Sequence, residues 1–243
     1  MKKIDAHAHI GNFGGWAGVE GSPEQLLTFM DQYEVEKTIL CAKDHTGNEE
    51  VAAAAAAHPD RFIPLVYLNP HEGEEECLRK MRRYVDELGF HGVKMNPLRH
   101  AFVADDAIVD PIMKAAEERH IPVFIHSGHP PYSLPWSIAL LAERWPSVPT
   151  VMIHMGHGHG VYIDAALKMA KRIPNIYLEM SGMPMGCKIY QAYHEVGHDR
   201  IMFGTDFPFH HPSVEIQKVL TCNLTEQELE DVFYNNAAKL MGL

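Results

Sequence analysis

The feature that most constrains this chain is an alternation that continues through all 243 residues. Short runs rich in β-branched and aromatic residues alternate with longer segments of helical periodicity. This alternation is typical of βα units, in which helices join parallel strands. We count eight such units, and no linker, low-complexity tract or change of composition separates them. Residues 1–243 are therefore predicted to form a single domain.

The predicted strands are short, and each lies between turn-forming or helical segments. They span residues 3–9, 37–41, 62–68, 92–95, 122–126, 150–154, 176–180 and 201–203. Helices are predicted where apolar residues recur at three- and four-residue spacing. The first begins at Ser22-Pro23 and runs through Met30, and the others span 51–57, 74–88, 106–119, 137–144, 162–171, 213–220 and 225–240. No helix is assigned between the seventh and eighth strands.

Eight βα units close most naturally into a (β/α)8 barrel, the TIM-barrel fold. The alternative is an open doubly wound sheet, which usually carries a glycine-rich phosphate loop after its first strand. In this chain that position holds the sequence HAHIG, residues 7–11. The predicted fold class is therefore α/β, with the topology of a (β/α)8 TIM barrel.

Composition narrows the range of functions. The 21 Lys and Arg against 32 Asp and Glu give a net charge of −11, which argues against nucleic acid or a membrane surface as partner. The four cysteines form no Cys-x-x-Cys pair, so neither a zinc ribbon nor a disulfide scaffold is indicated. Without a signal-like segment or a long apolar run, the default expectation is a soluble cytoplasmic protein. It would act on a small molecule, and its composition is compatible with a homodimer.

The first predicted strand ends in His7-Ala8-His9. Alternate side chains of a strand point to the same face, so the two imidazoles aim at one spot. The pair alone is weak evidence, because the chain contains 17 histidines. In a (β/α)8 barrel, however, the chemistry lies at the carboxyl ends of the strands, so the other strand ends test the prediction.

Those strand ends carry further metal-ligand types. The fifth predicted strand ends in His126, the sixth ends in His154, and Asp206 follows the eighth. Three His and one Asp around an open position suit a catalytic Zn²⁺ or a similar divalent metal. A single histidine at a strand end is more often structural, and a single Asp before a helix is more often a cap. The joint pattern favours a metal site.

Several motifs resemble those of the amidohydrolase superfamily, and within it the amidohydrolase-related branch (amidohydrolase 2) of metal-dependent TIM-barrel hydrolases and decarboxylases. They are DAHAHIG at 5–11, GFHGVKMNP at 89–97, IPVFIHSG at 121–128, VMIHMG at 151–156 and FGTDFP at 203–208. The chain ending, residues 224–240, is also similar to that branch. The resemblance spans essentially the whole chain.

This resemblance implies roles for the strand-end residues. His7, His9, His126 and Asp206 would hold one divalent metal ion, foremost Zn²⁺, with Mn²⁺ and Fe²⁺ as alternatives. Such an ion lowers the pKa of its bound water towards about 7. Asp206 would take a proton from that water, and His154 would orient the water or polarise the substrate. Asp206 and His154 are therefore the predicted catalytic residues.

Lys94, at the end of the fourth predicted strand, has two interpretations. In some other branches of the superfamily a carboxylated lysine at that strand bridges two metals, and His126 and His154 would then serve the second ion. The more ordinary interpretation is that Lys94 binds a substrate carboxylate or packs its stem in the barrel, because a free ammonium beside Zn²⁺ is unfavourable. One ion is favoured, and Lys94, Asn96 and Glu179 are the predicted substrate-binding residues.

The leading prediction is a metal-dependent hydrolase that attacks a small carboxylate-bearing amide, lactone or ester with a metal-activated water. The alternative is a metal-dependent non-oxidative decarboxylase of a small aromatic or unsaturated acid, in which Lys94 or Arg99 could hold the carboxylate. The two reactions use the same metal ligands, and the shortness of the chain favours hydrolysis. The net charge and Lys94 count against a metal-dependent deoxyribonuclease, and the full ligand set counts against a non-catalytic metal-binding protein. The loops that could form a lid carry Trp16, His129, Tyr132 and Trp136.

Overall fold

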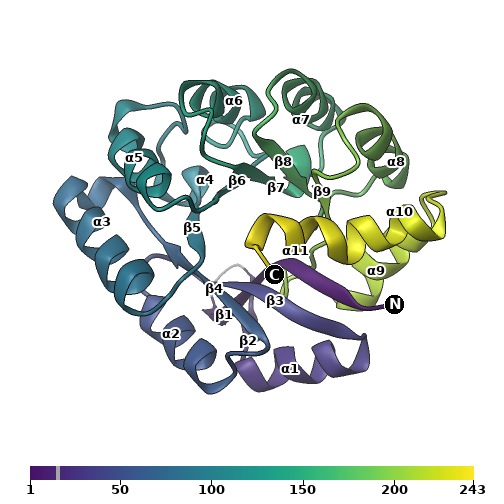
Figure 1. Ribbon diagram of the computed structural model, residues 1–243, viewed down its shortest axis with the longest axis horizontal. Coiled ribbons are helices and arrows are strands. Elements are labelled where there is room, and N and C mark those ends of the chain that lie inside the picture. The colour runs from purple at the N-terminus through teal and green to yellow at the C-terminus, as the bar shows by residue number, and fades with distance from the viewer. Residues whose placement is uncertain (15–16) are drawn as a thin grey trace.

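The computed structural model describes residues 1–14 and 17–243, which form a curled β-sheet surrounded by helices (Figure 1). Within the described residues the strands are β1 (Lys3–Phe13), β2 (Val19–Gly21), β3 (Val35–Ala42), β4 (Phe62–Tyr67), β5 (Gly92–Met95), β6 (Val123–His126), β7 (Thr150–Ile153), β8 (Ile176–Glu179) and β9 (Ile201–Met202). From β1 and β3 through β9, neighbouring strands pair in parallel and in chain order, while β2 forms an antiparallel hairpin with β1. The predicted (β/α)8 topology is confirmed.

The sheet closes because the segment after β9 returns to β1. The amide of Ala6 donates to the carbonyl of Phe203 at 2.9 Å, and the amide of His9 donates to the carbonyl of Phe207 at 2.8 Å. The amide of Asp206 donates to the carbonyl of His7 at 2.7 Å. The first and last strands of the barrel thus meet at a seam, and candidate metal ligands lie on both sides of it.

Helices follow the strands around the outside of the sheet (Figure 1). They are α1 (Pro23–Gln32), α2 (Asn48–Ala57), α3 (Glu74–Met81), α4 (Pro97–His100), α5 (Asp110–Glu118), α6 (Pro135–Arg144), α7 (Gly160–Arg172), α8 (Gly186–Glu195), α9 (Pro212–Leu220), α10 (Glu226–Glu230) and α11 (Asn236–Met241). α1 begins as its sequence predicts, because Ser22 and Gln25 form a reciprocal capping box and Pro23 occupies the first turn. In the part of the chain described, no helix combines the length and apolar character needed to cross a membrane.

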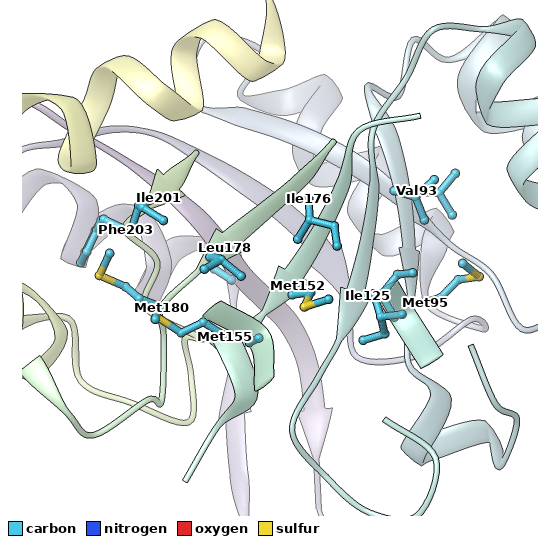
Figure 2. Close-up of a cluster of buried hydrophobic side chains, with 14 of the residues drawn as sticks. Val93, Met95, Ile125, Met152, Met155, Ile176, Leu178, Met180, Ile201 and Phe203 are labelled. Atoms are coloured by element: carbon cyan, nitrogen blue, oxygen red, sulfur yellow. The ribbon is translucent and has the colours of Figure 1, made fainter. Parts of the chain in front are cut away.

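Alternate strand residues pack into two separate apolar clusters. One set points outward against the helices, and Figure 2 shows members of it, among them Val93, Met95, Ile125, Met152 and Leu178. The other set, which includes Phe124 and Val151, points into the barrel, where Ala237 and Ala238 of α11 join it. α11 accordingly crosses one end of the barrel in Figure 1. With that end covered and the interior filled, the polar strand ends gather at the opposite mouth.

A β-bulge in β1 brings both histidines into the barrel. Between Asp5 and Ala8 the register of β1 against β3 shifts, so that β1 holds one extra residue. Before the bulge the even-numbered residues belong to the interior cluster, whereas after it the even-numbered residues belong to the outer cluster. The odd-numbered His7 and His9 therefore face the interior, as bulges next to active sites often arrange.

The structure corrects several details of the sequence prediction. A helix, α8, does lie between the seventh and eighth predicted strands, and its buried Ile189, Ala192 and Tyr193 recur at helical spacing. Pro184 before the helix and Gly186 at its first position are turn-forming residues, so the sequence favours a loop there. β1 runs beyond His9 to Phe13 because its end pairs with β2. The predicted helix over 74–88 divides into α3 and a π-helical segment, Arg82–Glu87.

Candidate metal centre

Three potential donor atoms meet at the barrel seam. Nε2 of His7 lies 3.1 Å from Nε2 of His9 and 3.2 Å from Oδ1 of Asp206, and Nε2 of His9 lies 3.5 Å from the same oxygen. All three side chains are buried. Atoms bound about 2.0–2.2 Å from a metal ion lie roughly 3.0–3.5 Å from one another. The triangle of two imidazole nitrogens and one carboxylate oxygen therefore fits a divalent metal.

Hydrogen bonds on the far side of the rings orient the free nitrogens. Nδ1 of His9 donates to the carbonyl of Ala42 at 2.9 Å, so Nε2 is the nitrogen that can exchange a proton for a metal ion. Nδ1 of His154 donates to the carbonyl of Ser181 at 2.8 Å and leaves its own Nε2 free in the same way. His154 offers a ligand atom within 4.8 Å of atoms from His7 and Asp206. The structure therefore brings the two predicted catalytic residues together.

The charges around the centre favour a cation. Burial opposes ionisation of Asp206, but the imidazoles of His154, His7 and His9 hold the pKa of its carboxyl well below the ordinary value. Burial also opposes protonation of His9, yet Cys41 and Asp206 raise the pKa of His9 to about 9. A position that stabilises positive charge on a buried imidazole suits a bound cation equally well.

His126 lies beside this triangle but outside it. Its ring packs edge-on against His154, with centroids 4.8 Å apart, and its Nε2 is 2.8 Å from Nδ1 of His129. Among the described residues, two groups have donor atoms within 4.8 Å of one another, one of His7, His9 and Cys41 and one of His7, His154 and Asp206. His126 belongs to neither group. Its role as the fourth ligand stays a prediction, and coordination would require Nε2 to exchange His129 for the metal. Burial holds the pKa of His126 well below its ordinary value, which keeps the ring neutral and able to ligate.

Lys94 points into the centre of the site. Its side chain is buried, and Nζ lies 3.4 Å from Nε2 of His7. Burial lowers the pKa of the Lys94 amine. The amine forms no ion pair with a carboxylate in the described part of the chain. Its position is compatible with the predicted contact to a substrate carboxylate.

The other two predicted substrate-binding residues are engaged with the protein. The carboxylate of Glu179 is buried and accepts from the amide of His154 at 3.2 Å and from the hydroxyl of Ser181 at 2.8 Å. Oδ1 of Asn96 caps α4 by accepting from the amide of Arg99 at 3.0 Å. These bonds indicate positioning roles, and direct contact with substrate stays a prediction for both. Trp16, one of the four predicted lid residues, lies outside the described residues.

Asp5 is a supporting residue that the sequence reasoning missed. Its buried carboxylate accepts from the amide and the hydroxyl of Thr205, at 2.9 and 2.5 Å, and from the amide of His7 at 3.1 Å. Burial raises the pKa of the Asp5 carboxyl to about 7. Asp5 thus fastens the strand that carries His7 to the loop that carries Asp206. Asp5 is the first residue of the DAHAH motif, which could have pointed to a role at the site. The alternating pattern of a strand does not distinguish it, however, from a residue that faces solvent.

The backbone is strained at two of the site residues. His154 has φ = 67° and Asp206 has φ = 54°, in the left-handed region that residues other than glycine rarely adopt. Such conformations cluster at functional sites, where the surrounding structure holds them in place. Here the amide of His154 donates to the carboxylate of Glu179, and the amide of Asp206 donates to the carbonyl of His7, and these two bonds provide that constraint.

A (β/α)8 barrel with buried His and Asp donors at its carboxyl-terminal mouth defines a class of metal-dependent barrel enzymes. Comparison with known proteins gives the family. The amidohydrolase family model matches residues 4–243, so this chain belongs to the amidohydrolase family and is an enzyme of that family with a divalent-metal site. Gamma-resorcylate decarboxylase from Polaromonas sp. (strain JS666) is 23% identical over 285 residues, covering 90% of this chain and 87% of that protein.

Solved structures match the fold over the full chain. A Tim-barrel protein from Bordetella bronchiseptica superposes with a TM-score of 0.83 at 22% identity, covering 100% of this chain and 99% of that one. Dihydroxybenzoic acid decarboxylase from Polaromonas sp. JS666, solved with bound manganese and the inhibitor 2-nitroresorcinol, superposes with a TM-score of 0.78 at 20% identity, covering 100% and 97%. A divalent metal is consistent with this neighbour, whereas the prediction of Zn²⁺ in particular is not confirmed.

Proposed function

We propose that this protein is a metal-dependent, non-oxidative decarboxylase of a small aromatic acid. One observation carries the proposal: the chain is similar over 90% of its length to a gamma-resorcylate decarboxylase, and its own strand ends supply the metal donors. Lys94 adds a buried amine next to those donors, where a substrate carboxylate would meet it. A charged or hydrogen-bonding amine in a site with little water is a strong partner for a carboxylate.

Hydrolysis, the leading prediction from the sequence, is not supported by the comparisons. That prediction leaned on the shortness of the chain. Chain length in a barrel enzyme varies mainly through loops and insertions outside the eight units, so it reports little about the reaction. The ligands are common to both reactions, and only the relatives distinguish them.

His7, His9 and Asp206 would hold the metal, and His126 is the predicted fourth ligand. When bound, a divalent cation there would act as a Lewis acid on the substrate's carboxylate. The activities of protein reconstituted with different ions would identify the metal. Mn²⁺ is the first candidate because a structural neighbour contains it. Carboxylate and imidazole donors accept both Mn²⁺ and Zn²⁺.

The chain's own residues handle the proton. Decarboxylation breaks the bond between the ring carbon and the carboxyl carbon, leaves the electron pair on the ring carbon and releases CO₂. One proton must then bind to that carbon. Asp206, which is ionised at rest, would first receive a proton that reaches it from solvent through His154 and would then pass that proton to the ring carbon.

The test is a CO₂-release assay. Protein reconstituted with Mn²⁺ or Zn²⁺ is incubated with dihydroxybenzoates, other aromatic acids, amides and lactones, and CO₂ and hydrolysis products are measured together. We expect CO₂ from at least one hydroxylated aromatic acid and none from Asp206→Asn, because that change weakens a metal donor and removes the group that carries the proton. Hydrolysis of an amide or lactone without CO₂ from any acid would overturn the proposal.

A further inference from the structure

Tyr67 carries a buried hydroxyl that neither the metal centre nor the packing of the barrel explains. Its side chain is fully buried, and Oη has no hydrogen-bond partner among the described residues. The side chain of Asn96 lies near this hydroxyl without meeting it in hydrogen-bond geometry, and Oδ1 of Asn96 already accepts from the amide of Arg99. A buried polar group costs free energy unless it is bonded, so an unpartnered hydroxyl points to a ligand.

Tyr67 is the last residue of β4 and faces the barrel interior at its carboxyl-terminal mouth. Ile63 and Leu65, at the alternate positions before it, belong to the interior cluster. In the register of β4 against β5, Tyr67 is the partner of Lys94. The two long side chains therefore start from neighbouring positions on one face of the sheet, and Nζ of Lys94 ends 3.4 Å from Nε2 of His7.

Cys41 connects the hydroxyl of Tyr67 with the metal centre. Its Sγ lies 3.3 Å from Nδ1 of His9. Burial raises the pKa of the Tyr67 hydroxyl well above its ordinary value, and the nearby Cys41 thiol adds to that rise. Burial lowers the pKa of the Lys94 amine, and the same thiol opposes that change. The phenol, the thiol and the amine thus line one part of the mouth, and the phenol keeps a proton to donate in a hydrogen bond.

Two contacts hold Tyr67 in this position. The paired register of β3 and β4 ends at Leu40 and Pro64, and beyond it the buried side chain of Asn48 takes the place of the neighbouring strand. Oδ1 of Asn48 accepts from the amide of Tyr67 at 2.8 Å, and Nδ2 donates to its carbonyl at 2.9 Å. The ring of His100 packs edge-on against the tyrosine ring, with centroids 5.7 Å apart. The hydroxyl is therefore preorganised to meet a ligand.

We propose that the Tyr67 hydroxyl binds the carboxylate of the substrate beside Lys94. The inference rests on the proposed function for the nature of the ligand, an aromatic acid. A hydroxyl that donates to a carboxylate makes a short and strong hydrogen bond, and this bond supplies the partner that the protein does not. The contact is present before the reaction and during it, so its loss should raise KM and leave kcat nearly unchanged.

Isothermal titration of the Mn²⁺-loaded protein with benzoate tests the contact. We expect Tyr67→Phe to bind benzoate about tenfold more weakly than the wild-type protein, because one hydrogen bond to a charged group is lost. Without ligand, the unfolding midpoint of this variant should stay at or above that of the wild-type protein, since the hydroxyl that it lacks has no partner in the fold. A purely structural role would give the opposite result, a lower midpoint with unchanged binding.

Tyr193→Phe is the matched control. Tyr193 lies on α8, outside the barrel, and its hydroxyl donates to the carboxylate of Asp231 at 2.7 Å. Its removal should lower the unfolding midpoint and leave the benzoate affinity within about twofold. Equal benzoate affinity of the wild-type protein and Tyr67→Phe would overturn the inference. So would a wild-type protein that does not bind benzoate, or a loss of stability in Tyr67→Phe as large as that in Tyr193→Phe.

The binding measurement does not depend on turnover. Weaker benzoate binding by Tyr67→Phe, together with no CO₂ from any acid, would support the carboxylate contact and refute the proposed reaction. CO₂ release with the same KM and the same benzoate affinity in both proteins would do the reverse.

Discussion

The chemistry of the centre depends on which nitrogen of each histidine carries a proton. Ala42 fixes the proton of His9 on Nδ1, and Ser181 does the same for His154. In each ring the nitrogen that faces the cluster is therefore free to bind a cation or move a proton. Nδ1 of His7 differs, because it is buried and has no hydrogen-bond partner among the described residues. The orientation of the His7 ring thus depends on the donors that surround its Nε2.

Substitution of His7 and of His154 should separate metal binding from catalysis. We expect His7→Ala to retain less than about a tenth of the wild-type metal, because it removes the donor nearest to both His9 and Asp206. His154→Ala should retain about one equivalent and lose CO₂ release. Metal analysis of the purified variants is the measurement, and His159→Ala on the exposed loop is the control. Loss of metal from His154→Ala would instead favour a centre in which His154 is a ligand.

Gly204 leaves room for Glu179. A Cβ at position 204 would lie 2.3 Å from Oε1 of Glu179 and 3.2 Å from the amide of His7. Gly204→Ala should therefore displace Glu179 from its bonds to His154 and Ser181 and destabilise the protein by about 1–3 kcal/mol. Denaturant unfolding measures the loss. Gly158→Ala is the matched control, because no described atom lies within 4 Å of its Cβ position, and equal stability of the two variants would contradict the argument.

At the level of elements, the local sequence determined most helices and strands, and long-range pairing determined the exceptions. The strand Gly92–Met95 matches its prediction, because its apolar alternation ends at an Asn-Pro pair that caps the next helix. The hairpin of β1 with β2 and the bulge at Asp5 could not be predicted from one strand, since both depend on the register between two strands. The hairpin also positions Phe13, whose ring packs edge-on against the ring of His9.

The N-terminal cap of α1 should contribute measurably to the stability of the fold. Ser22 accepts from the amide of Gln25 at 3.2 Å, and the Gln25 side chain accepts from the amide of Ser22 at 2.9 Å. Ser22→Ala should cost about 1 kcal/mol of unfolding free energy, because one amide in the first turn loses its acceptor. Thr28→Ala on the exposed face of the same helix should cost less, since alanine has the higher helix propensity. Urea unfolding followed by circular dichroism compares the two, and a larger loss for Thr28→Ala would refute the capping argument.

At the scale of the whole molecule, eight strands that point the same way explain why scattered residues could be assigned to one site. Residues as distant as His7, His154 and Asp206 had to meet once the barrel topology was known. The place of His126 beside the triangle could not be inferred in the same way. It depends on side-chain rotamers, which the order of strands leaves open.

Closure of the barrel and binding of the metal are coupled, because the donors lie on opposite sides of one seam. His7 and His9 belong to β1, and Asp206 belongs to the segment after β9. An ion bound to all three would join the first and last strands, and at 100 times its dissociation constant it would stabilise the fold by about 2.7 kcal/mol. Removal of metal by a chelator should therefore loosen the seam more than the opposite wall of the barrel.

Hydrogen exchange of the chelated and metal-loaded protein measures this difference. Amides of β1 and of residues 203–207 should lose protection when metal is removed, whereas those of β5, β6 and β7, which pair with one another away from the seam, should change little. His7→Ala should exchange like the chelated protein whether or not metal is added, because it lacks the donor that links the two sides. Uniform loss of protection through all the strands would show that the ion stabilises the barrel as a whole and not through its seam.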